Sequence, residues 1–114
     1  GIEILVGKNN LQNQHITHKL AKHNEVWMHV KDAPGSHVLI KQPFPLSETT
    51  LRTAAQLAAY YSSLKHSSSV PVDYVEVRYI KKVPGRIGSF VTYKNNKTIY
   101  IDPDPDFIIK LQKK

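Results

Sequence analysis

One stretch, Trp27 to Lys41 (WMHVKDAPGSHVLIK), concentrates the side chains that could do chemistry. It holds the single tryptophan, and His29 and His37 lie on either side of an Ala-Pro-Gly-Ser turn that ends in Ser36. A serine, a histidine and an acid are the components of a nucleophilic triad. Neighbouring residues of a strand point to opposite faces, so Ser36 and His37 cannot readily hydrogen-bond to each other. No GxSxG sequence surrounds the serine. The stretch therefore contains no convincing catalytic residue, and we expect the chain not to be an enzyme.

A metal site is the second chemistry that these residues suggest. His29 and His37 are expected on facing strands, and His15 and His18 lie three residues apart on a predicted helix. Zinc needs three or four ligands from Cys, His or carboxylates, but the chain has no cysteine and no HExxH spacing. The acidic run 102–106 lacks the glycine of a calcium loop, and helix capping explains it better. We expect no metal ion and no cofactor.

The run Gly7-Lys8-Asn9-Asn10 is a candidate phosphate contact. It follows a predicted strand and precedes a predicted helix, where backbone amides favour anions and Lys8 adds positive charge. It is not a nucleotide-binding P-loop, because the second glycine and the Gly-Lys-Ser/Thr end are missing. An ordinary turn is the alternative for this run.

The charge balance favours a polyanionic partner. Sixteen Lys and Arg residues against nine Asp and Glu give a net charge of +7 and a pI near 9.7. Lys81, Lys82 and Arg86 surround a Pro-Gly turn and are candidate contacts. Lysines at strand turns are usually only solvated, so one continuous basic patch does not follow from the sequence.

The elements that must position these residues indicate a single α+β domain over residues 1–114. We expect a mainly antiparallel sheet of about five or six strands with about three helices packed on it. The predicted strands are 3–6, 27–30, 37–41, 72–82, 89–93 and 98–101, and the predicted helices are 13–22, 48–65 and the segment that Asp104 caps.

Turn residues define the expected connections. Strands 27–30 and 37–41 should form a hairpin through a type II turn in which Gly35 has a positive φ. The Asn-Asn pair at 95–96 should join the last two strands as a second hairpin. No apolar run is long enough to span a bilayer, so we expect no membrane insertion. The start is not a signal peptide, and the chain reads as a segment of a longer protein.

Several motifs in order resemble the NFACT-R domain, found in the C-terminal part of NFACT proteins. They are ILVGKNN at 4–10, WxHVKDxPGSHV at 27–38, AAxLAAYYS at 54–62, VPVDY at 70–74 and VxYxKK at 77–82. The resemblance implies RNA binding within a cytoplasmic ribosome-associated quality-control factor. That factor binds tRNA and the large ribosomal subunit and supports C-terminal alanine tailing of stalled chains. Streptococcal members are also described as fibronectin-binding adhesins, which implies fibronectin as a second partner and a cell-surface location without a signal peptide.

The resulting hypothesis is a recognition hairpin. Trp27, His29, Ser36 and His37 would line one end of the sheet near the run 8–10 and meet RNA phosphate or 2′-OH groups. Lys81, Lys82 and Arg86 would add charge. In the alternative, Trp27 packs in the core and the histidines bond to the backbone.

Overall fold

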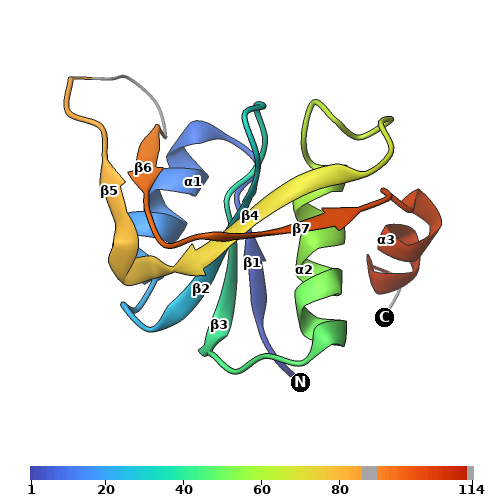
Figure 1. The fold of residues 1–114 in the computed structure, drawn as a ribbon, viewed down its shortest axis with the longest axis horizontal. Coiled ribbons are helices and arrows are strands. Elements are labelled where there is room, and N and C mark those ends of the chain that lie inside the picture. The colour runs from blue at the N-terminus through green and yellow to red at the C-terminus, as the bar shows by residue number, and fades with distance from the viewer. Residues whose placement is uncertain (86–89, 113–114) are drawn as a thin grey trace.

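Strands and helices follow one another in mixed order through residues 1–85 and 90–112, the part of the chain that the computed structural model describes. The strands are β1 (Ile4–Val6), β2 (Glu25–Val30), β3 (Val38–Pro43), β4 (Val70–Glu76), β5 (Ile80–Lys82), β6 (Val91–Tyr93) and β7 (Lys97–Ile101). The helical elements are α1 (Asn10–His15), the π-helical turn η1 (Ile16–Leu20), α2 (Glu48–Tyr60), the 3₁₀ turn η2 (Val77–Tyr79) and α3 (Pro105–Gln112). The α+β prediction is confirmed (Figure 1).

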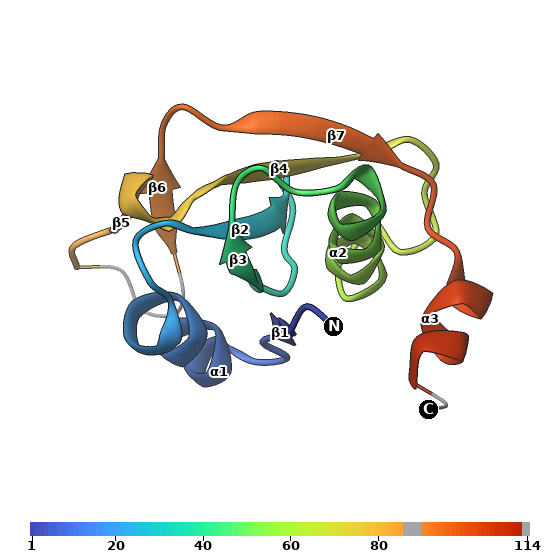
Figure 2. The same ribbon diagram turned by 90° about the horizontal axis from the view of Figure 1, so that it is seen from below.

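Two antiparallel sheets form within the described residues. The larger has the strand order β1-β3-β2-β4-β7, and β5 pairs with β6 in the smaller one. Strand β2 is central, and its alternate side chains point to opposite faces of the sheet. Figure 2 shows α2 on one side of this sheet and α1 with β5 and β6 on the other. None of the described helices is both long and apolar enough to cross a bilayer.

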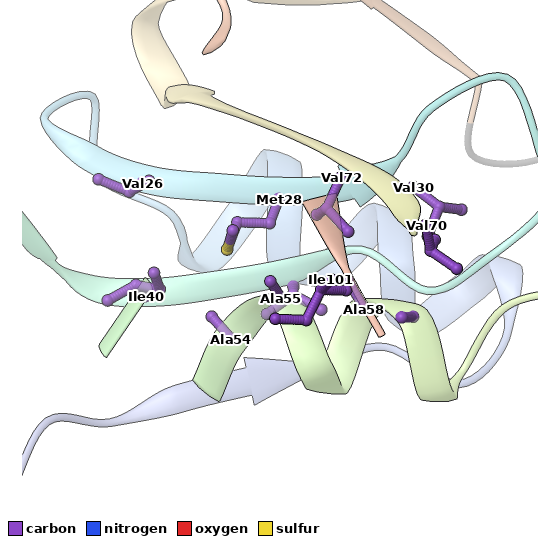
Figure 3. Close-up of a cluster of buried hydrophobic side chains, with 12 residues drawn as sticks. Val26, Met28, Val30, Ile40, Ala54, Ala55, Ala58, Val70, Val72 and Ile101 are labelled. Atoms are coloured by element: carbon purple, nitrogen blue, oxygen red, sulfur yellow. The ribbon is translucent and has the colours of Figure 1, made fainter. Parts of the chain in front are cut away.

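Helix α2 covers one face of the sheet through its alanines. Ala54, Ala55 and Ala58 are fully buried against Met28 and its β-branched neighbours from β2, β3, β4 and β7 (Figure 3). Such small side chains let the helix backbone approach the sheet closely. The Ser47 side chain caps the helix, since its Oγ accepts from the Thr50 N–H at 3.1 Å.

The opposite face holds a second core cluster. Trp27 and Leu39 project from β2 and β3, and they pack with Ile16, Val75 and Val77. Helical turns η1 and η2 and the β5–β6 pair supply the cover on this side. Val75, Val77 and the half-buried Tyr79 lie together on this side of the sheet.

The predicted extension of the second helix to residue 65 was wrong. Helix α2 ends at Tyr60, because the next residues turn aside and pair with the β2–β3 loop. The Ser62 hydroxyl donates to the Ala59 carbonyl at 2.7 Å, which satisfies one carbonyl of the last turn.

The predicted single strand 72–82 and the predicted second hairpin were also wrong. Turn η2 interrupts the segment after β4, and the Arg78 N–H donates to the His23 carbonyl at 3.0 Å. The chain then starts β5, which pairs with β6, whereas β7 returns to pair with β4. Asn95 has the expected positive φ of 61°, but its turn connects the two sheets.

The turn of the β2–β3 hairpin differs from the prediction in one detail. The hairpin is confirmed, but the positive φ of its loop falls on Asp32 (φ 55°) and not on Gly35.

Ile16 is buried while Leu20, four residues later, is 42% exposed. The π-helical turn explains this difference, because its bond from the Ala21 N–H to the Ile16 carbonyl spans five residues and rotates Leu20 outward.

Candidate nucleic-acid interface

Three segments far apart in the sequence enclose a surface hollow of about 470 Å³, here called the tyrosine groove. Its walls are residues 8–10 and 13 at the start of α1, residues 34–36 of the β2–β3 loop, and residues 60–63 at the end of α2. The run 8–10 therefore lies beside Ser36, as the sequence predicted. Lys8, Asn9 and Asn10 are exposed.

Backbone pairing fixes two walls of the tyrosine groove. The Ser36 N–H donates to the Tyr61 carbonyl at 3.0 Å, and the Ser63 N–H donates to the Pro34 carbonyl at 3.0 Å. Gly35 sits between these bonds, and a Cβ on it would lie 2.9 Å from the Ser62 Cβ. Glycine is required here for close approach of two backbones rather than for a turn conformation.

The third wall is held by buried polar contacts. The Gly7 N–H donates to the His37 carbonyl and the His37 N–H donates to Asn13 Oδ1, both at 3.0 Å. Asn9 caps α1, because its Oδ1 accepts from the Gln12 N–H at 2.8 Å. The groove is therefore preformed, which reduces the entropy lost when a ligand binds.

Trp27 and His37 support the interface from inside. Trp27 is 0% exposed and His37 2%. The Trp27 Nε1–H donates to Thr17 Oγ1 at 3.1 Å, and that oxygen lies 2.6 Å from His37 Nδ1. A fully buried indole offers no face to a base, so the core alternative for Trp27 fits the structure. Ser36, at 6% exposed, contributes mainly its backbone.

His29 lines a second hollow, of about 560 Å³, on the other side of the same loop together with Asp32, Phe90 and Tyr93. Its ring stacks on Trp27 at 5.7 Å, with 8° between the planes. Its Nδ1 lies 2.6 Å from the Val30 carbonyl oxygen and its Nε2 3.2 Å from that of Gly35.

The pKa of His29 is lowered by burial of its ring. The two carbonyls of Val30 and Gly35 and the carboxylate of Asp73 act in the opposite direction, but burial prevails. Neutral His29 carries one N–H and can donate to only one of its two carbonyl neighbours.

This shift predicts that acid destabilises the domain. The unfolded histidine has the higher pKa, so the unfolded state binds more protons and stability falls as the pH drops through about 6.5. Urea midpoints at pH 7.5 and 5.5 should differ less in His29→Gln than in the native chain. Exposed His66→Gln is the control and should keep the native pH dependence. Equal pH dependence in all three proteins would contradict the assignment.

Asp73, across the sheet from His29, is a buried carboxylate with its bonds satisfied. It accepts from the Tyr93 hydroxyl at 2.6 Å and from the Thr98 hydroxyl at 2.7 Å. Burial and this carboxylate raise the pKa of the Tyr93 phenol. This network of hydrogen bonds joins β4, β6 and β7 and supports the structure of the domain. In residues 1–85 and 90–112, no three histidine or acidic side chains gather as a metal site would require.

Basic side chains of η1 and β5 meet away from the groove. Lys81 and Lys82 are exposed on β5, and Arg86 lies outside the described residues. The pKa of His18 is lowered by burial and then by the charges of Lys82 and Lys19, which places both lysines near this imidazole. Sequence reasoning missed Lys19, because only the tertiary structure brings η1 beside β5.

Sequence reasoning also missed Tyr60 and Tyr61 at the groove and Lys65 beside it. All three lie within the longer helix, 48–65, that the sequence predicted. Both rings are half-buried in the structure, and the Lys8 Nζ lies 4.9 Å from the centre of the Tyr61 ring. The signal in the sequence was a Tyr-Tyr pair followed by a basic residue. It indicates a surface site only once the end of the helix is known, because that end decides whether these side chains are exposed.

Comparison with known proteins identifies the family. The model described as NFACT protein RNA binding domain matches residues 1–94. The Bacillus subtilis protein named Rqc2 homolog RqcH is 50% identical over 113 residues, covering 99% of this chain and 20% of that protein. The Streptococcus suis protein of the same name is 48% identical over 105 residues, covering 92% of this chain and 19% of that one. The chain thus spans about one fifth of these relatives.

A solved structure agrees with the sequence relatives. The C-terminal part of the fibronectin/fibrinogen-binding protein from Streptococcus suis superposes with a TM-score of 0.89 at 47% identity. The match covers 94% of this chain and 44% of that one. Fold, sequence and family model coincide, and the chain belongs to the NFACT-R family.

Proposed function

We propose that this chain is the RNA-binding domain of a ribosome-associated quality-control factor. The observation that carries the proposal is the match of residues 1–94 to the NFACT RNA-binding domain family, with about half of all residues identical in an RqcH protein. The parent protein would bind tRNA and the large ribosomal subunit in the cytoplasm and support C-terminal alanine tailing. The domain itself would bind RNA and catalyse nothing.

The charge distribution supports an RNA ligand. The chain carries a net charge of +7, and Lys8, Lys19, Lys81 and Lys82 are exposed. Lysines that neutralise phosphates supply the sequence-independent part of the affinity, and folded RNA is recognised largely by shape, phosphate and 2′-OH groups. The preformed walls around the tyrosine groove suit recognition of a fixed shape.

Binding of labelled tRNA should depend steeply on salt. We expect the logarithm of the affinity to fall linearly with the logarithm of salt concentration, by about 0.7 per phosphate neutralised. Lys82→Gln should reduce this slope by about one such contact. Lys110→Gln on α3, which lies beyond α2 and far from β5 (Figure 2), removes the same charge and should leave the slope unchanged. Fluorescence anisotropy of labelled tRNA over a range of salt concentrations measures the affinity of the native chain and of the two variants.

Absence of tRNA binding at low salt would overturn the proposal. Fibronectin belongs in the same experiment, because the solved relative is named as a fibronectin/fibrinogen-binding protein. Tight, salt-tolerant binding of fibronectin without binding of tRNA would favour the adhesin function, in which a sheet edge or the basic surface docks the partner. Salt-dependent binding of tRNA with weak fibronectin binding is the expected result.

A further inference from the structure

The tyrosine groove carries a pair of aromatic rings with a lysine over each. The Lys65 Nζ lies 4.1 Å from the centre of the Tyr60 ring, and the Lys8 Nζ lies 4.9 Å from that of Tyr61. The two rings contact each other edge to face, with centroids 4.9 Å apart and 86° between their planes. Tyr60, Tyr61 and Lys8 line the preformed hollow, and Lys65 adjoins it through its contact with the Tyr60 ring.

We propose that the tyrosine groove binds unpaired RNA, with a base stacked on Tyr60 or Tyr61 and flanking phosphates held by Lys8 and Lys65. The inference rests on the proposed RNA-binding function and names the part of the RNA and the residues that meet it. A hollow of about 470 Å³ lies within the range of about 300–1,000 Å³ typical of small-molecule sites, so it has room for a nucleotide.

The relative strengths of the two interactions favour a base over a lysine side chain on the face of each tyrosine ring. An exposed cation–π contact contributes less binding free energy than the stacking of a base on an aromatic side chain. The displaced ammonium group stays within reach of the adjoining phosphate, where its charge is better neutralised. The base therefore displaces the lysine from the ring face with a net gain in binding free energy.

The ring geometry makes the site selective for single strands. Because the two rings are nearly perpendicular, one base can stack on only one of them. A base in a duplex has both faces covered by its neighbours and offers none to a tyrosine. Asn9 adds hydrogen-bond donors, because its side-chain oxygen is used by the Gln12 N–H and its amide N–H groups remain for a ligand.

The decisive experiment compares binding of an unstructured RNA oligonucleotide and of a matched RNA duplex to this chain by fluorescence anisotropy. Tyr60→Leu and Tyr61→Leu remove the ring faces, and Tyr60→Phe and Tyr61→Phe retain them. At least one Leu variant should weaken single-strand binding about 5- to 150-fold, the effect of one lost stack. The Phe variants should bind like the native chain, and duplex binding should change little in all four.

The lysine variants keep the test valid where a leucine perturbs folding. Lys8→Gln and Lys65→Gln should weaken single-strand binding, and each should lower the salt slope by about 0.7. Lys110→Gln is the matched control of equal charge on α3 and should match the native protein.

The outcomes separate this inference from the proposed function. RNA binding by the native chain that neither the Leu nor the Lys variants weaken would overturn the groove site and leave the RNA-binding function standing. Lack of RNA binding by the native chain would overturn both. Equal losses for single strand and duplex would overturn the specificity for unpaired RNA.

Discussion

Replacing Trp27 by alanine is expected to lower the free energy of unfolding by about 3–5 kcal/mol, the usual cost of deleting a buried large aromatic side chain. Trp27 is fully buried between the sheet and its η1–β5–β6 cover, where its ring meets His29, His37 and Tyr93 at centroid distances of 5.1–5.7 Å. Truncation leaves a cavity beside the second hollow, which Trp27 lines, and removes the donor to Thr17. Urea unfolding followed by circular dichroism measures the loss.

Trp27→Phe retains part of the packing and removes the hydrogen bond. Phenylalanine keeps an aromatic ring but is smaller than tryptophan, so this variant loses the N–H donor and leaves a smaller cavity than alanine does. The expected loss of stability is therefore smaller than that of Trp27→Ala. The native chain offers a second readout, since Trp27 is the sole tryptophan. Its emission should resist quenching by acrylamide with and without RNA. If acrylamide quenched the emission strongly, RNA suppressed that quenching and the alanine variant were stable, Trp27 would belong to the binding surface and not to the core.

Gly7→Ala is expected to lower the free energy of unfolding by about 2–4 kcal/mol, which combines overpacking with disruption of a buried hydrogen bond. A Cβ on Gly7 would overlap the Asn13 side-chain oxygen and lie 2.9 Å from the Asn13 backbone nitrogen. That oxygen accepts from the His37 N–H, so the new methyl group forces apart the contact that holds residues 7–10 against the hairpin. RNA affinity should also fall, because the same contact forms a wall of the tyrosine groove.

Gly1→Ala is the matched control for this substitution. A Cβ on Gly1 has no described heavy atom within 4 Å, so the same chemical change should leave both stability and RNA binding at native values. Thermal melts and the anisotropy assay applied to the three proteins give the comparison. A Gly7→Ala protein as stable as Gly1→Ala would show that residues 7–13 adjust freely and that the groove wall is not fixed as described.

The sequence determined the elements whose patterns are local. Alternating β-branched residues specify β2, β3 and β4, and Ser47 with the alanine face specifies the start and orientation of α2. These features depend on the pleat, the helical repeat and a cap, which involve neighbouring residues only. The position of the run 8–10 near the hairpin at 27–41 was a hypothesis, because it concerns segments separated by residues 11–26, and the structure brings the run beside Ser36.

Only the tertiary structure decided where elements end and which side chains reach the surface. Helix α2 stops at Tyr60 because Tyr61 and Ser63 form backbone hydrogen bonds with the 34–36 loop, a contact between segments about 26 residues apart. That ending exposes the tyrosine pair and creates the groove. The sequence placed Trp27 in the right hairpin. Its burial depends on the cover that η1 and the β5–β6 pair supply, and residue spacing within one strand does not predict that cover.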